Sequence, residues 1–280
     1  FYMKSDNLII MAAGASSRMK KSLKKEMFDS EGFEIANNSH KSLIPLGKQG
    51  RPLVYYLIKN AIEANYSNIY IITGADNTDF KEFIISQFFE NVNIQFVIQN
   101  IPKGREKPLG TSDAVVQALD QFPELKKNIF TVCNGDNLYS VETLNLLKEK
   151  RNHPHALISY SWSAFSYEKE RISKFAVISM DSNNNLKDIV EKPDVNIVDN
   201  YRDESGDLGL SMNIFSFTGP LVYSYVKDCP INEKRNEKEL PEAVRVLIRE
   251  NPNSIYCYKV FEHLPDLTDS SDIDNFKNME

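Results

Sequence analysis

The sequence contains little cysteine, little tryptophan and no long apolar run. Its 280 residues include three cysteines and one tryptophan. Three cysteines scattered over the chain are too few for a disulfide framework or a zinc site, so we expect a protein of the reducing cytoplasm. The apolar runs have the length of strands rather than of membrane helices. We therefore expect neither a signal peptide nor a membrane partner.

An excess of positive charge is also missing. The formal net charge is −6, which argues against general binding to nucleic acid through a basic surface. One local exception runs from Arg18 to Lys25 and holds five basic residues and no acidic one. Such a run is either a solvated surface or the electropositive rim of an anion site. Its position directly after a turn of small residues favours the rim.

Glycine is scarce where a nucleotide fingerprint would need it. The apolar residues 8–11 end in the small residues 12–17, Ala-Ala-Gly-Ala-Ser-Ser, and Arg18 follows. Small residues leave backbone N–H groups free to face an anion, and a guanidinium group suits phosphate oxygens. Because Gly14 stands alone, the turn matches neither the dinucleotide fingerprint nor a P-loop. It is either a phosphate cradle or an ordinary strand-to-helix turn with a surface arginine.

Strand-like and helix-like segments alternate through the first half of the chain. The expected strands cover residues 8–11, 68–73, 94–98, 128–133 and 156–160. The expected helices cover residues 53–64, 79–89, 112–121 and 141–150. This alternation predicts parallel βαβ units in a sheet covered on both faces. Ligands of such sheets bind outside the carboxyl ends of the strands.

The second half of the chain is richer in strands. Strands are expected at residues 175–180, 186–191, 210–217 and 254–261. Helices are expected at residues 220–226, at 240–250 and from about Asp272 onward. The predicted fold class is therefore α/β: a Rossmann-like mixed, mostly parallel sheet flanked by helices. We expect the strand-rich second half to close over the first.

Three charged residues at strand ends suggest phosphate chemistry. Asp136 follows the apolar residues 129–133, where an acid is costly unless a cation such as Mg²⁺ meets it. Lys41 and Lys192 each adjoin an apolar stretch. Taken singly, Asp136 could equally be an aspartate of an ordinary turn, and each lysine an ordinary surface residue. Together with Arg18 they would supply the metal ligand and the fixed positive charge that phosphoryl transfer requires.

Five motifs in order give the sequence a specific resemblance. They are LIIMAAGASSRM at residues 8–19, HKSLIPL around Lys41, KPLGTSDAV at 107–115, NGDN around Asp136 and VEKP around Lys192. In order and spacing they resemble the sugar-1-phosphate nucleotidyltransferases, over nearly the whole chain. The resemblance implies a GT-A-like fold and a single domain over residues 3–280. It also implies transfer of a nucleoside monophosphate from a nucleoside triphosphate to a sugar 1-phosphate, with Mg²⁺ as cofactor.

The resemblance also implies roles for individual residues. Residues 3–150 would form the nucleotide-binding half and residues 151–280 the sugar-phosphate-binding half. Arg18 would bind the triphosphate, Lys41 would be the essential lysine beside the reacting phosphates, and Gln99 would read the base edge. The implied nucleotide site consists of Ala12, Ala13, Gly14, Ser16, Arg18, Gln99, Gly110 and Thr111. The implied catalytic residues are Arg18, Lys41, Asp136 and Lys192.

The sugar and metal sites follow from the same resemblance. Glu191 and Lys192 would hold the sugar and its phosphate. Asn213 would contact a sugar hydroxyl or complete a strand-end hydrogen bond. Asp136 would be the first metal ligand. The second would come from the acidic stretch 266–272, where Asp266 takes the metal role, Asp269 competes for it and Asp272 caps the last helix.

Some features depart from the family pattern. Twenty-two residues separate Arg18 from Lys41, a length that indicates a helical insertion. Phe175-Ala176 stands where many relatives have Tyr-Gly, and Asn213 lies near a position where they have Gly. The base, the sugar and the oligomeric state stay open, and apolar strand edges are compatible with a homodimer. The alternatives are a transferase for a non-sugar phosphate such as phosphocholine, or a catalytically silent subunit that binds a nucleotide sugar.

Overall fold

One mixed sheet runs through the computed structural model, which describes residues 5–14, 43–165, 169–267 and 270–276. Ten strands belong to this sheet within those residues, in the order β5-β4-β1-β6-β11-β7-β10-β8-β9, and β12 pairs with β7 beside that path. A separate two-stranded hairpin joins β2 (Pro45–Leu46) to β3 (Arg51–Pro52). The strands of the sheet are β1 (Asn7–Met11), β4 (Asn68–Thr73), β5 (Asn93–Ile98), β6 (Ile129–Asn134), β7 (His155–Ser161), β8 (Ala176–Met180), β9 (Leu186–Glu191), β10 (Gly209–Ser211), β11 (Phe215–Thr218) and β12 (Ile255–Val260).

The first half of the sheet is parallel. β1 lies between β4 and β6, and β4 pairs with β5, all in parallel register. Leu8, Ile9 and Ile10 are fully buried. Successive side chains of a strand point to opposite faces, so β1 is buried on both faces, as a central parallel strand must be. This confirms the predicted α/β class with a mixed sheet.

The second half is built mainly from antiparallel pairs. β11 pairs antiparallel with both β6 and β7 and so joins the two halves of the sheet. β10 lies between β7 and β8, and β9 follows β8 at the edge. β12 pairs parallel with β7. The carboxyl ends of the parallel strands therefore face the loops of a strand-rich second half.

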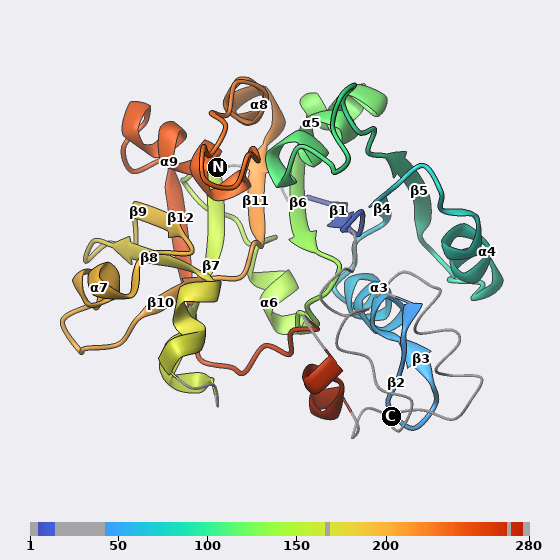
Figure 1. The fold of residues 1–280 in the computed structure, drawn as a ribbon, viewed down its shortest axis with the longest axis horizontal. Helices are drawn as coiled ribbons and strands as arrows, with labels where there is room; N and C mark the ends of the chain where they lie inside the picture. The colour runs from blue at the N-terminus through green and yellow to red at the C-terminus, as the bar shows by residue number, and fades with distance from the viewer. Residues whose placement is uncertain (1–4, 15–42, 166–168, 268–269, 277–280) are drawn as a thin grey trace.

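Helices cover both faces of the sheet (Figure 1). On one face α3 (Leu53–Glu63), α4 (Thr78–Ser86) and α6 (Val141–Leu146) pack in the cluster that holds Leu8 and Ile10. On the other face α5 (Thr111–Gln121), α8 (Gly219–Lys227) and α9 (Leu240–Glu250) pack in the cluster that holds Ile9. The remaining short helices are η3 (Pro123–Lys126), η4 (Trp162–Ala164), η5 (Lys169–Lys174), α7 (Val195–Val198), η6 (Asp199–Tyr201) and η7 (Ser270–Phe276). Among the described residues no helix is long and apolar enough to cross a membrane.

Two sequence predictions were wrong in detail. The strand expected over residues 210–217 is two strands, β10 and β11, because the chain changes neighbours between them. Asn213 makes this change with φ of +53°, a left-handed conformation that asparagine tolerates better than most residues. The C-terminal helix begins at Ser270 rather than at Asp272. Asp272 is therefore no N-cap, and its buried carboxylate instead pairs with Arg171 at 2.8 Å.

Candidate active site

The carboxyl ends of the strands border a hollow of about 380 Å³. Its walls come from the segments after β1, β5, β6 and β9, together with the start of α5 and the loop before α9. A second hollow of about 120 Å³ adjoins it and shares Asp136, Glu191, Lys192 and Asn213 with it. The two together form one cleft along the edge at which parallel α/β sheets bind their ligands.

Most of the residues implied by the resemblance line this cleft. The large hollow is lined by Ala12, Ala13, Gly14, Gln99, Gly110, Thr111, Asp136, Glu191, Lys192 and Asn213. Asp266 lines the adjoining hollow. Ser16, Arg18 and Lys41 lie outside the described residues, as does Asp269. The structure thus brings together residues that are up to about 250 positions apart in the sequence.

The close approach of β1 and the loop after β6 depends on Gly135. Its N–H donates to the carbonyl of Met11 at 2.9 Å. A Cβ on Gly135 would lie 3.0 Å from that carbonyl and 3.1 Å from the Cβ of Ala12. A glycine here lets Asp136 stand directly beside the small residues that end β1.

The acidic side of the cleft joins the loop after β6 to the C-terminal segment. Leu267 N–H donates to the backbone carbonyl of Asp136 at 2.8 Å, and Asn137 pairs with Asp266 as an antiparallel bridge. The Asn137 amide donates to the Asp266 carboxylate at 3.2 Å, and Arg171 lies 3.4 Å from that carboxylate. Asp266 is buried. The fold therefore holds two carboxylates of distant sequence origin at one end of the cleft.

Lys192 and Asn213 have an unusual backbone conformation. Lys192 has φ of +48°, and its N–H donates to the carbonyl of Phe175 at 3.1 Å. Its ammonium group lies 3.4 Å from the carboxylate of Glu191. Left-handed conformations of non-glycine residues are strained and gather at functional sites. The neighbouring Asn213 is also left-handed, and its buried Oδ1 accepts no hydrogen bond from any described residue.

Sequence reasoning missed a charged cluster on the far wall of the cleft. Arg235 lies 3.4 Å from Glu191 and forms ion pairs with Glu237 and Glu239. Burial, and then the charge of Glu191, raises the pKa of Glu239 to about 7. Residues 233–239 read Glu-Lys-Arg-Asn-Glu-Lys-Glu, which looks like an ordinary solvated surface. The one available signal is that Arg235, Glu237 and Glu239 stand at every second position, which in an extended chain puts their side chains on the same face.

The pKa of Glu239 gives a testable pH dependence. A carboxylate whose pKa rises on folding binds more protons in the native state, so its contribution to stability falls as pH rises through about 5 to 7. We expect Glu239→Gln to gain about 1–3 kcal/mol of unfolding free energy relative to the parent protein when both are moved from pH 5 to pH 8. Urea unfolding at both pH values measures this change. Glu237→Gln, a more exposed partner of the same arginine, is the control, and an equal gain in it would contradict the assignment.

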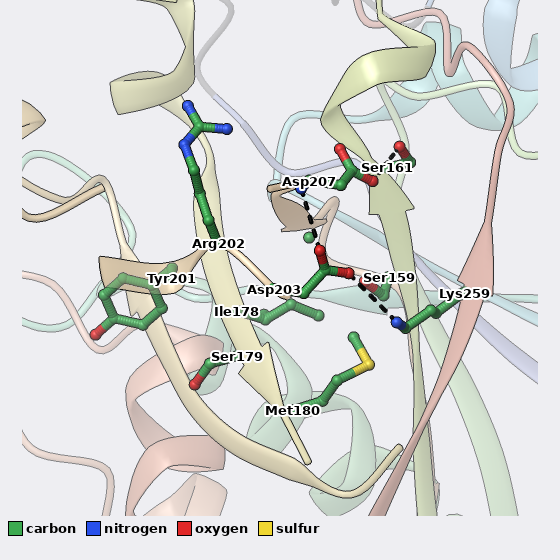
Figure 2. A pocket seen from close by; sticks show the side chains of 11 residues that line it. Ser159, Ser161, Ile178, Ser179, Met180, Tyr201, Arg202, Asp203, Asp207 and Lys259 are labelled. Carbon is green, nitrogen blue, oxygen red and sulfur yellow. Dashed lines mark hydrogen bonds and ion pairs between the residues drawn. The ribbon is translucent and has the colours of Figure 1, made fainter. Parts of the chain in front are cut away.

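Another hollow, of about 70 Å³, lies apart from these residues (Figure 2). It is bordered by residues of β7, β8, β10 and β12 and by the loop after η6. Two of its charged groups, Asp203 and Lys259, form an ion pair at 3.5 Å and point toward one another in Figure 2. No residue implied by the family resemblance lines it. The larger cleft is therefore the candidate active site.

Comparison with known proteins shows the family of the chain. A family described as nucleotidyl transferase matches residues 33–262 of the chain. The chain belongs to the nucleotidyl transferase family. Among curated relatives, "Bifunctional protein GlmU" of Methanococcus vannielii is 25% identical over 240 residues, which cover 86% of this chain and 47% of the relative. The chain thus spans about half the length of the curated relatives that it matches.

Solved structures of similar fold cover nearly the whole of this nucleotidyl transferase. A UDP-glucose pyrophosphorylase complexed with UDP-glucose has a TM-score of 0.72 at 18% identity, with 99% of this chain and 97% of that chain covered. The inositol-1-phosphate CTP transferase from T. maritima has a TM-score of 0.68 at 13% identity, with 97% and 93% covered. At these identities the likeness establishes the fold alone. The expected GT-A-like nucleotidyltransferase fold is confirmed.

Proposed function

We propose that this nucleotidyl transferase moves a nucleoside monophosphate from a nucleoside triphosphate to a sugar 1-phosphate, forming an NDP-sugar and pyrophosphate. The observation that carries the proposal is one cleft lined by Gln99, Gly110 and residues 12–14 as a first group and by Asp136, Glu191 and Lys192 as a second. The first group suits a nucleotide and the second a phosphorylated sugar. The UDP-glucose found with the similar pyrophosphorylase fits the same division.

The chemistry needs charge neutralisation more than proton transfer. A phosphate oxygen of the sugar 1-phosphate attacks the α-phosphorus, and the bond from that phosphorus to the pyrophosphate oxygen breaks. The attacking oxygen is already ionised at neutral pH, so no general base is required. In keeping with this, no histidine lines the cleft in the described part of the chain. Lys192, with Arg18 and Lys41, would offset repulsion between the two polyanions and fix an in-line approach.

Asp136 and Asp266 fit a bound Mg²⁺. Magnesium takes oxygen ligands and in nucleotide sites is held by one or two carboxylates plus substrate phosphates, so a larger cluster is not needed. Within the described residues no group of three or more His, Cys, Asp or Glu side chains is placed to hold a metal. The Asp266 carboxylate is buried and lies 3.4 Å from Arg171, so a positive charge already stabilises its ionised form at this place. When bound, the ion would neutralise charge on the triphosphate.

Asn213 and Glu191 are the residues that we propose for the sugar itself. Asn213 lines the cleft together with Glu191, where its side-chain amide would contact a sugar hydroxyl. The Glu191 carboxylate lies 3.4 Å from the charged groups of both Lys192 and Arg235, which hold it in place. We further propose that the two halves of the chain divide the substrates, with residues 3–150 holding the nucleotide and residues 151–280 the sugar phosphate.

A substrate panel tests the proposed function. Pyrophosphate release is measured with Mg²⁺ for each nucleoside triphosphate against hexose and aminohexose 1-phosphates, with phosphocholine as the non-sugar acceptor. We expect release with at least one sugar 1-phosphate and none with phosphocholine. Release with phosphocholine alone would contradict the sugar assignment. If no substrate pair gives pyrophosphate release and the protein binds a finished NDP-sugar tightly, the result would indicate a regulatory subunit instead.

A further inference from the structure

The side-chain amide of Gln99 has a fixed orientation in this chain. Its nitrogen donates to the backbone carbonyl of Gly110 at 3.1 Å and to the carboxylate of Asp113 at 3.2 Å. An amide nitrogen has two protons, and here both have acceptors. Turning the amide over would place its oxygen against a carbonyl and a carboxylate, neither of which can donate. The amide therefore has one favourable orientation.

The Asp113 carboxylate is itself held by a second glutamine, Gln117. The N–H of Asn100 can only donate, and it donates to the amide oxygen of Gln117 at 2.8 Å. The nitrogen of that amide then faces two acceptors, the Asn100 carbonyl at 3.1 Å and the Asp113 carboxylate at 2.9 Å. Asp113 and Gln117 are one turn apart on α5, so both reach the same point. Gln117 therefore holds the Asp113 carboxylate in position beside the Gln99 amide.

The carbonyl oxygen of Gln99 is what remains for a ligand. Gln99 is buried and lines the cleft. Its Oε1 accepts no hydrogen bond from the residues that the structure describes, yet it is not among their fully buried, unpartnered polar atoms. The oxygen is therefore accessible, and the cleft is the space that Gln99 lines. From the Gln99 side chain, a ligand therefore meets an acceptor and no available donor.

This pattern discriminates between nucleobases. Uracil, thymine and guanine carry a ring N–H on the edge used for base pairing, and a carbonyl oxygen can accept it. Cytosine and adenine carry a ring nitrogen acceptor beside an amine there, so they need a donor and an acceptor together, as a free amide provides. Here the donor is already committed to Gly110 and Asp113. The ring nitrogen of cytosine or adenine would lose its hydrogen bond to water without gaining another.

We propose that Asp113 and Gln117 are positioning residues that present the carbonyl oxygen of Gln99 to the base, and so select triphosphates whose base has a ring N–H over those of cytosine and adenine. This inference rests on the nucleotide site of the proposed function. The similar structures include proteins named for UDP-glucose and for CTP, so the fold alone does not decide the base. The orientation of one amide does.

UTP and CTP form the sharpest pair for a test, because they differ only at the edge that Gln99 would face. We expect kcat/KM, measured by pyrophosphate release with the best acceptor of the panel, to favour UTP at least tenfold. Asp113→Ala is expected to reduce the UTP/CTP ratio at least fivefold, because it removes one of the two acceptors that hold the Gln99 amide in its orientation. Asp113→Asn retains an oxygen that accepts from both glutamines, so it is expected to keep the ratio near that of the parent protein.

Three controls separate positioning from other effects. Asp120→Ala removes an exposed aspartate of the same helix, which pairs with Lys126, and is expected to leave the ratio unchanged. Gln117→Met breaks the hydrogen-bond chain one step earlier and is expected to lower the ratio in the same direction as Asp113→Ala. Thermal unfolding of each variant shows whether a lost preference merely reports a damaged fold, because damage alone would lower kcat/KM for UTP and CTP alike.

The outcomes for the inference and for the proposed function are distinct. Pyrophosphate release at equal kcat/KM for UTP and CTP would overturn the inference but not the proposed transferase function. If no acceptor gives turnover, the proposed function fails. Calorimetric Kd values for UTP and CTP then decide the inference: tighter UTP binding that Asp113→Ala abolishes supports it. Equal binding, or binding of neither, overturns it.

Discussion

Asp136→Asn is expected to lower kcat at least a hundredfold while the protein stays folded. The change keeps the size of the side chain and removes its negative charge, and in a water-poor site one such charge contributes several kcal/mol, of which a hundredfold loss is about 2.7 kcal/mol. The fold should survive because the hydrogen bond from Leu267 N–H to the backbone carbonyl of Asp136, which ties this loop to the C-terminal segment, is left in place by the substitution. Steady-state pyrophosphate release and thermal unfolding measure the two effects.

Asp207→Asn is the matched control for that experiment. Asp207 lies at the separate small hollow, where its carboxylate accepts from Ser161. The Asp207→Asn substitution makes the same chemical change outside the cleft, so we expect kcat within about twofold of that of the parent protein. Near-normal turnover of Asp136→Asn, or an equal loss in both variants, would contradict the role assigned to Asp136.

Gly110→Ala is expected to cost about 3–5 kcal/mol of unfolding free energy, at the upper end for single substitutions. Gly110 has φ of +125°, and an added Cβ would lie 2.3 Å from the backbone carbonyl of Lys238. Because that neighbour is backbone, the clash cannot be relieved by rotating a side chain. The loop before α9 is also tied to the start of α5 by the bond from Ser112 N–H to the Lys238 carbonyl, at 3.0 Å. Urea unfolding measures the loss.

Gly104→Ala separates the two causes of this loss. Gly104 also has a positive φ, of +85°, but an added Cβ there would meet nothing within 4 Å. Only the conformational penalty remains, so we expect a cost of about 1 kcal/mol. The difference between the losses of unfolding free energy in the two variants is therefore the contribution of the clash at Gly110. Equal losses would show that the start of α5 and the loop before α9 are not packed as closely as described.

The strand ends that border the cleft were predictable because their signals are local. β1 and β6 are apolar runs that stop abruptly at small or polar residues, and alternation with helices predicts a parallel sheet. That order alone puts the end of β1 and Asp136 at the same edge. The sequence could not show that α5 and the loop before α9 meet at Gly110, because no local pattern marks a contact between segments more than 100 residues apart.

The break at Asn213 and the cluster around Arg235 escaped prediction for different reasons. Residues 210–217 read Leu-Ser-Met-Asn-Ile-Phe-Ser-Phe, and such a mostly apolar segment looks like one strand until the pairing partners of its two ends are known. Arg235 and Glu239 stand in a run of charges that is typical of solvent-exposed surface. Glu239 is buried and Arg235 is half-buried because that loop folds against Glu191. An ion pair between a loop and the end of a distant strand leaves no periodic signal.

The sequence by itself determined the class of the fold, the edge of the sheet that bears the site and the family resemblance, because each depends on short segments with strong local preferences. Only the tertiary structure decided which side of the Gln99 amide meets the cleft and what charge surrounds Glu191. Those properties depend on hydrogen bonds and ion pairs with residues brought in from α5 and from the loop before α9. The sequence shows that residue 99 is a glutamine but not which way its amide is turned. The neighbours of that amide in space decide whether it offers the ligand an acceptor or a donor.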